Sequence, residues 1–205
     1  MLLVGVDENG LGPRLGPLIA TAVCLEAKVY ERARLQRVAA RVGIGDSKQT
    51  SAFGHMRVAE GLSLAIMESL HGRVPNSVDE LLQLLELEGP ELLRASCPDG
   101  SRAQCWSFQV ALPAFEGDVA EGRAQLARLY KHGVRLRSAR SVVTCAGRMN
   151  EQLRRLGSRS SVDLWMFERL VLAAVNGEGA AELAFVLGMV GGIRDHERYF
   201  SLIAA

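Results

Sequence analysis

The sequence has few aromatic residues and no long apolar run. Aromatic side chains make up 5% of its 205 residues, so base stacking on aromatic rings cannot dominate any binding surface. No apolar run approaches the roughly 20 residues with which a helix crosses a bilayer. The first six residues carry no basic segment of the kind that opens a secretory signal. We therefore expect no membrane attachment and a cytoplasmic location.

Cysteine is also scarce, and its spacing argues against zinc. The four cysteines, Cys24, Cys97, Cys105 and Cys145, form no Cys-x-x-Cys pair. Such pairs are a common feature of structural zinc sites. We expect reduced thiols, in or beside strands, in a protein of a reducing compartment.

The apolar pattern favours one α/β domain over residues 1–205. The hydrophobic content of 48% and the charged content of 23% are ordinary for a globular chain. Apolar, β-rich runs predict strands at residues 1–7, 17–26, 140–146 and 182–188. Helical spacing predicts helices at residues 30–42, 52–70, 78–87, 121–132, 149–156 and 162–176. An opening hairpin followed by alternating strands and helices predicts a mixed α/β sheet flanked by helices.

Charge is balanced over the whole chain but segregated along it. The net charge is +1, yet residues 123–159 carry ten basic side chains against one acid, and residues 28–57 carry seven against two. Residues 79–91 carry five acids and no basic residue. Two interpretations stay open for the basic segments. They form either solvated helix faces or a surface for a polyanion such as nucleic acid.

The stretch VGVDENGLGPRLGP is the least ordinary part of the sequence. Its apolar run ends on two adjacent acids, Asp7 and Glu8, and the next nine residues contain three glycines and two prolines. An unpaired carboxylate at the edge of a core is costly. A positive group is therefore expected nearby, and the candidates are a basic side chain, a helix terminus or a metal ion.

This stretch, together with the later GDSK at residues 45–48, resembles the opening of the type 2 ribonucleases H (ribonuclease HII). In that family the first strand ends in Asp-Glu, a Gly-x-Gly-Pro turn and a Gly-Pro pair follow, and a later loop carries Asp-Ser-Lys. The same elements stand here in the same order. The resemblance implies a ribonuclease H-like mixed sheet that opens with a β-hairpin. It also makes residues 71–122, with a strand-like run at 105–113, an insertion.

The activity that the resemblance implies is that of a metal-dependent endonuclease. Its substrate would be RNA in RNA/DNA hybrids, or a duplex with embedded ribonucleotides, and its cofactor Mg²⁺ or Mn²⁺. Asp7 and Glu8 would be the catalytic metal ligands. Neighbouring residues on a strand point to opposite faces, so Glu8 joins the site only if the chain bends after it. The residues that would bind the substrate are Gly10, Leu11, Gly12, Asp46, Ser47 and Lys48.

The chain departs from the family at three points. Leu11 stands where the family has arginine, and Gly188 and Met189 stand where the third acid is expected. The fourth acid would lie beyond residue 205, so the chain looks shortened at its C-terminus. The acids that could complete the set are Asp46, Asp163, Asp195 and Glu197. The alternatives are therefore a degenerate module that binds nucleic acid or a protein without cutting, and a structural or metabolic protein that keeps only the fold.

Overall fold

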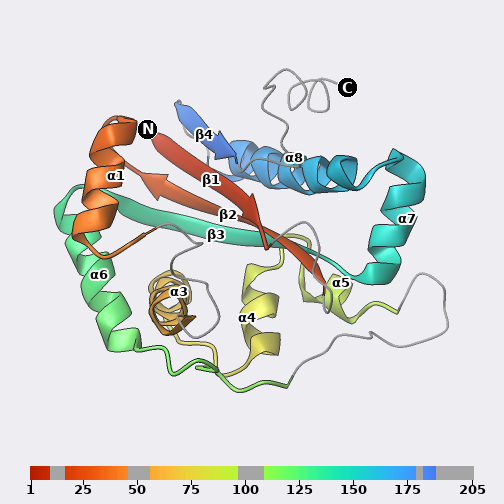
Figure 1. Cartoon of the computed structure of the whole chain (residues 1–205), viewed down its shortest axis with the longest axis horizontal. Coiled ribbons are helices and arrows are strands. Elements are labelled where there is room, and N and C mark those ends of the chain that lie inside the picture. Colours follow the sequence, from red (N-terminus) through yellow and green to blue (C-terminus); the bar gives the residue numbers. More distant parts are fainter. Residues whose placement is uncertain (10–16, 46–55, 97–108, 179–181, 188–205) are drawn as a thin grey trace. The chain divides into compact units, whose positions relative to one another are not determined.

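A four-stranded mixed sheet forms the centre of the fold. The structure is a computed structural model, which describes residues 1–9, 17–45, 56–96, 109–178 and 182–187. The strands are β1 (Leu2–Glu8), β2 (Leu18–Glu26), β3 (Arg135–Thr144) and β4 (Leu183–Leu187). They lie in the order β3-β2-β1-β4 (Figure 1). The structure confirms the predicted α/β class and the predicted opening hairpin.

The register of the β1–β2 hairpin decides which way each acid of β1 points. Met1 and Ala27 exchange two hydrogen bonds of 3.1 Å, and Asn9 N–H donates to the Ile19 carbonyl at 2.9 Å. This antiparallel register places Asp7 opposite Thr21 and Glu8 opposite Ala20. Because side chains alternate along a strand, Glu8 shares a face with neighbouring apolar residues that are buried. These residues are Val4, Val6, Leu18, Ala20, Ala22 and Cys24.

The helices fall into two compact units of the chain. The first unit holds residues 1–3, 25–84 and 108–138, and the second holds residues 4–24, 85–107 and 139–205. The helices of the first unit are α1 (Arg32–Arg41), α3 (Met56–His71), α4 (Val78–Leu85, ending at the boundary) and α6 (Val119–Lys131). Those of the second are α5 (Pro90–Arg94), α7 (Ala146–Leu156) and α8 (Arg159–Glu178). No helix in the described part of the chain is long and apolar enough to span a membrane.

One predicted strand is wrong in the part that the structure describes. Residues 109–113 form a single antiparallel bridge, between Ala111 and Ser77, instead of a strand. Two hydrogen bonds of 2.9 Å flank the bridge, from Val78 N–H to the Val110 carbonyl and from Leu112 N–H to the Asn76 carbonyl. Proline at the next position, 113, has no N–H to donate, so it cannot extend the pairing.

In the first unit, α3 and α6 approach each other closely at Gly61 and Gly122, and Figure 1 shows α3 end-on beside α6. A Cβ added to Gly61 would lie 2.5 Å from the Asp118 carbonyl oxygen, and one added to Gly122 would collide with the backbone of Gly61. Beside this crossing, the Glu60 carboxylate accepts hydrogen bonds of 2.6 to 2.9 Å from three N–H groups, those of Ala114, Phe115 and Gly117. The loop before α6 is thereby tied to α3.

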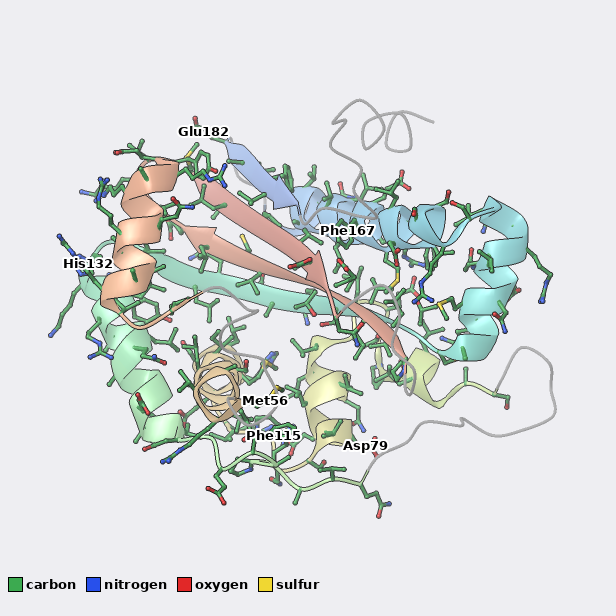
Figure 2. All side chains as sticks on the ribbon, viewed as in Figure 1. Met56, Asp79, Phe115, His132, Phe167 and Glu182 are labelled. Carbon is green, nitrogen blue, oxygen red and sulfur yellow. The ribbon has the colours of Figure 1, made fainter. Side chains whose placement is uncertain are left out.

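In the second unit, α8 packs its apolar side on the strands. Phe167, labelled on α8 in Figure 2, is 1% exposed, and Thr144 of β3 contacts Met166 of α8 at 3.6 Å. Among the described residues of this unit, two acids are buried, Asp163 and Glu86. Glu86 is 4% exposed and accepts a hydrogen bond of 3.2 Å from Val143 N–H. Burial raises the pKa of Glu86 to about 7, although this hydrogen bond and the charges of two nearby arginines act in the opposite direction.

We expect Gly122→Ala to destabilise the protein, because the added methyl has no space between α3 and α6. Overpacking of this kind costs about 1 to 3 kcal/mol. The matched control is Gly177→Ala on α8, where an added Cβ meets nothing within 4 Å and where alanine is the better helix former. Urea unfolding monitored by circular dichroism measures both free energies. Equal stability of the two variants would contradict the close crossing.

Glu86 also predicts a pH dependence of stability. A carboxyl whose pKa is raised on folding binds its proton more tightly in the folded state, so its stabilising effect is lost as the pH rises through about 7. We expect Glu86→Gln to flatten the fall in unfolding free energy between about pH 5 and 8, and to gain on the order of 1 to 2 kcal/mol over the wild type at pH 8. Glu151→Gln, at an exposed site on α7, is the charge-matched control. A wild-type profile that does not fall over this range would contradict the prediction.

Candidate active site

Two of the predicted site residues, Asp7 and Glu8, are the last residues of β1. Of the four acids considered as completing the set, the structure describes Asp163, on α8. The predicted substrate-binding residues Gly10, Leu11, Gly12, Asp46, Ser47 and Lys48 lie outside the described residues, as do Gly188, Met189, Asp195 and Glu197.

The end of β1 is held by its own polar groups. Glu8 N–H donates to Asp7 Oδ1 at 3.0 Å. The Asn9 side chain donates to the Pro17 carbonyl at 3.3 Å and accepts from Ile19 N–H at 3.0 Å. It thereby connects the end of β1 to the start of β2. Sequence reasoning missed this role of Asn9. The available signal was an asparagine next to a glycine-rich turn, where its amide commonly bonds to the backbone.

Asp163 and Glu8 form the unusual feature of the second unit. Asp163 is 0% exposed, and within the described residues neither of its oxygens has a hydrogen-bond partner. Oε2 of Glu8 is likewise buried without a partner. Burial raises the pKa of Glu8, and the adjacent Asp7 and the charge of Asp163 raise it further. The interaction shows that α8 brings a third carboxylate toward the pair that ends β1.

The nearest identified positive group is Arg159, one helical turn before Asp163. Burial raises the pKa of Asp163, and the charge of Arg159 lowers it in part. Nε and Nη2 of Arg159 are themselves buried without hydrogen-bond partners, and no ion pair joins Arg159 to Asp163 in the described part of the chain. The dipole of α8 adds little at Asp163, because its effect falls off within the first turn. Sequence reasoning also missed Arg159, because nothing in the sequence distinguishes it from the many other basic residues of this region.

The unpartnered oxygens have the donor chemistry of a hard divalent cation. Mg²⁺ and Mn²⁺ prefer oxygen ligands, and Mg²⁺ is commonly held by one or two carboxylates together with substrate phosphate. Within the residues that the structure describes, no group of three or more His, Cys, Asp or Glu side chains is arranged to hold a metal ion. The donor set therefore fits an ion held jointly with substrate better than one held in a preformed cage.

Comparisons of the chain with family models, with curated proteins and with solved structures find no match in any of the three. The resemblance to the type 2 ribonucleases H accordingly rests on the residues quoted from the sequence.

We expect Mn²⁺ to raise the melting temperature of the wild type and Asp163→Asn to abolish that rise, because the amide cannot replace an anionic ligand. At 100 times its dissociation constant, a ligand that binds only the folded state stabilises it by about 2.7 kcal/mol. Asp79→Asn, in the first turn of α4, is the control and should keep the full response. Circular dichroism in EDTA verifies that each variant folds. An undiminished response in Asp163→Asn would remove Asp163 from the metal site.

Proposed function

We propose that the protein is a metal-dependent endonuclease of the ribonuclease HII type, which cuts RNA in RNA/DNA hybrids or at embedded ribonucleotides. The observation that carries the proposal is the pair of buried, unpartnered carboxylates, Glu8 and Asp163, beside Asp7. Their position supports it, because Glu8 ends the first strand of a mixed sheet that opens with a hairpin and the charge of Asp163 acts on it there. A ribonuclease H-like fold is part of the same proposal.

Glu8 and Asp163, with Asp7 beside them, would hold a divalent ion jointly with a substrate phosphate, because the described acids form no cage of three by themselves. When bound, such an ion supplies an acidified water as nucleophile and neutralises charge on the leaving oxygen. Glu8 is fixed by the hairpin register and Asp163 by the packing of α8, so neither needs to be ordered when substrate arrives. Burial and mutual repulsion oppose ionisation of the pair until a cation is near.

Arg159 supports a phosphate position next to these acids. Its two unpartnered nitrogens, Nε and Nη2, are the edge with which a guanidinium binds a phosphate through two parallel hydrogen bonds. Because the charge of Arg159 reaches Asp163, a phosphate bound there would lie close to the carboxylates. In this role Arg159 would orient the substrate, while the acids take part in the chemistry.

The second candidate is a module on the same fold that binds nucleic acid or a partner protein without cutting. Leu11 in place of the family's arginine favours it, and so do Gly188 and Met189 in place of an acid. Retained binding without cleavage would distinguish this candidate from the nuclease.

Cleavage of a labelled duplex carrying one ribonucleotide tests the proposal, in Mg²⁺ and then in Mn²⁺. The wild type should cleave, whereas Asp7→Ala and Asp163→Asn should each lose at least about 100-fold in rate, because ligand loss removes transition-state stabilisation of several kcal/mol. Asp79→Asn, purified in parallel, should cleave like the wild type and excludes a contaminating nuclease. No cleavage by the wild type in either metal, with the duplex still bound, would replace the nuclease by the binding module.

A further inference from the structure

The first unit contains a pocket of about 200 Å³, lined by segments from both basic regions of the sequence. One wall comes from the end of β2 and the first half of α1, and contributes Lys28 and Arg34. The other comes from the end of α6 and the turn into β3, and contributes Lys131 and His132, of which Figure 2 labels His132. Buried Val38 and Val134 provide apolar lining.

The charge of this pocket is not balanced by nearby acids. No acidic side chain is among the described residues that line it. The two closest acids in the sequence point their charge elsewhere, because Glu26 pairs with Arg137 at 3.8 Å and Glu31 pairs with Arg37 at 3.7 Å. Within the described ranges, none of the four basic lining residues makes an ion pair.

The helix dipoles at the pocket do not decide whether it prefers anions or cations. α1 begins there and α6 ends there, so the positive end of one helix dipole and the negative end of the other offset each other. The side chains therefore set the sign. Lys131 and His132 close α6, and Gly133, with φ of 77°, turns the chain into β3 so that both line the same pocket as Arg34.

We propose that this pocket binds a phosphate group. Lysine and arginine are the side chains that bind phosphate most strongly, and here they surround a concave site with an apolar base. The volume is below the roughly 300 Å³ at which pockets begin to hold whole drug-sized ligands. It admits a phosphoryl group with part of what carries it. The phosphate could belong to a nucleic-acid strand or to a free phosphorylated small molecule. In the first case the inference rests on the proposed function and extends it.

Titration with inorganic phosphate in metal-free buffer at constant ionic strength tests the pocket directly. We expect the double variant Arg34→Gln/Lys131→Gln to bind phosphate at least about 10-fold more weakly, because it loses two charged hydrogen-bond donors to the phosphate. The control Arg41→Gln/Arg128→Gln removes the same charge from exposed positions on the same two helices, outside the pocket lining. Its affinity should change by less than about 2-fold, as expected for screened surface charges. Equal weakening in both variants, or no binding by the wild type, would overturn the inference.

A second titration identifies the source of the phosphate. The probes are a duplex with one ribonucleotide and a 5′-mononucleotide, both without divalent metal. Weaker duplex binding by the pocket variant alone would assign the phosphate to nucleic acid. Pocket-dependent binding of the mononucleotide without the duplex would keep the pocket and reject the nucleic-acid partner of the proposed function. Duplex cleavage that persists while phosphate binding is absent would reject the pocket and keep the nuclease.

Discussion

The antiparallel pairing of β1 with β2 is the constraint on which the candidate site depends. Its register directs Glu8 to the buried face of the sheet, Asp7 still interacts with the Glu8 side chain at the strand end, and Asn9 ties that end to Pro17 and Ile19. Slipping the register by one residue would exchange the two faces and bury Asp7 instead. The position of α8 then adds Asp163 to the face that Glu8 occupies. Two desolvated carboxylates thus approach each other because of backbone pairing and helix packing, and not because of any attraction between them.

Like charges in a desolvated site need a counter-charge or a proton. Two unit charges at 4 Å interact by roughly 4 kcal/mol at the dielectric of a protein surface, and each also loses hydration on burial. Burial is the main reason that the pKa values of Glu8 and Asp163 are raised, and the neighbouring acids Asp7 and Asp163 raise that of Glu8 further. Arg159 compensates only in part, since its own Nε and Nη2 have no partners. A cation bound by these acids would remove the same repulsion and leave both carboxylates charged, which is the state that metal-assisted hydrolysis uses.

Local sequence patterns predicted most helices and strands, whereas tertiary packing determined which side chains come together. Apolar runs and the Gly/Pro-rich turn were sufficient for β1 and β2, and the Asp-Glu pair identified two acids of the site. No local pattern marks Asp163 as a site residue, because it lies in an amphipathic helix and the local sequence does not determine how that helix packs on the sheet. Residues 109–113 were assigned wrongly because apolar content predicts a strand even where a proline limits the pairing. The sequence also does not reveal the basic pocket, since Arg34 and Lys131 are far apart along the chain and come to line one pocket only in the folded structure.

The two charge systems would contribute to different parts of one reaction. A phosphate held by Arg34 and Lys131 has the same charge before and during cleavage of a bond elsewhere in the strand, so this contact stabilises substrate and transition state alike. Such uniform binding lowers KM and leaves kcat unchanged. In the proposed nuclease the carboxylates would act at the phosphate where charge develops, so their contribution would appear in kcat. A chain that lost its carboxylate chemistry but kept its cations would still bind nucleic acid. Binding alone therefore cannot establish nuclease activity, and the effect of replacing the acids on cleavage is the deciding measurement.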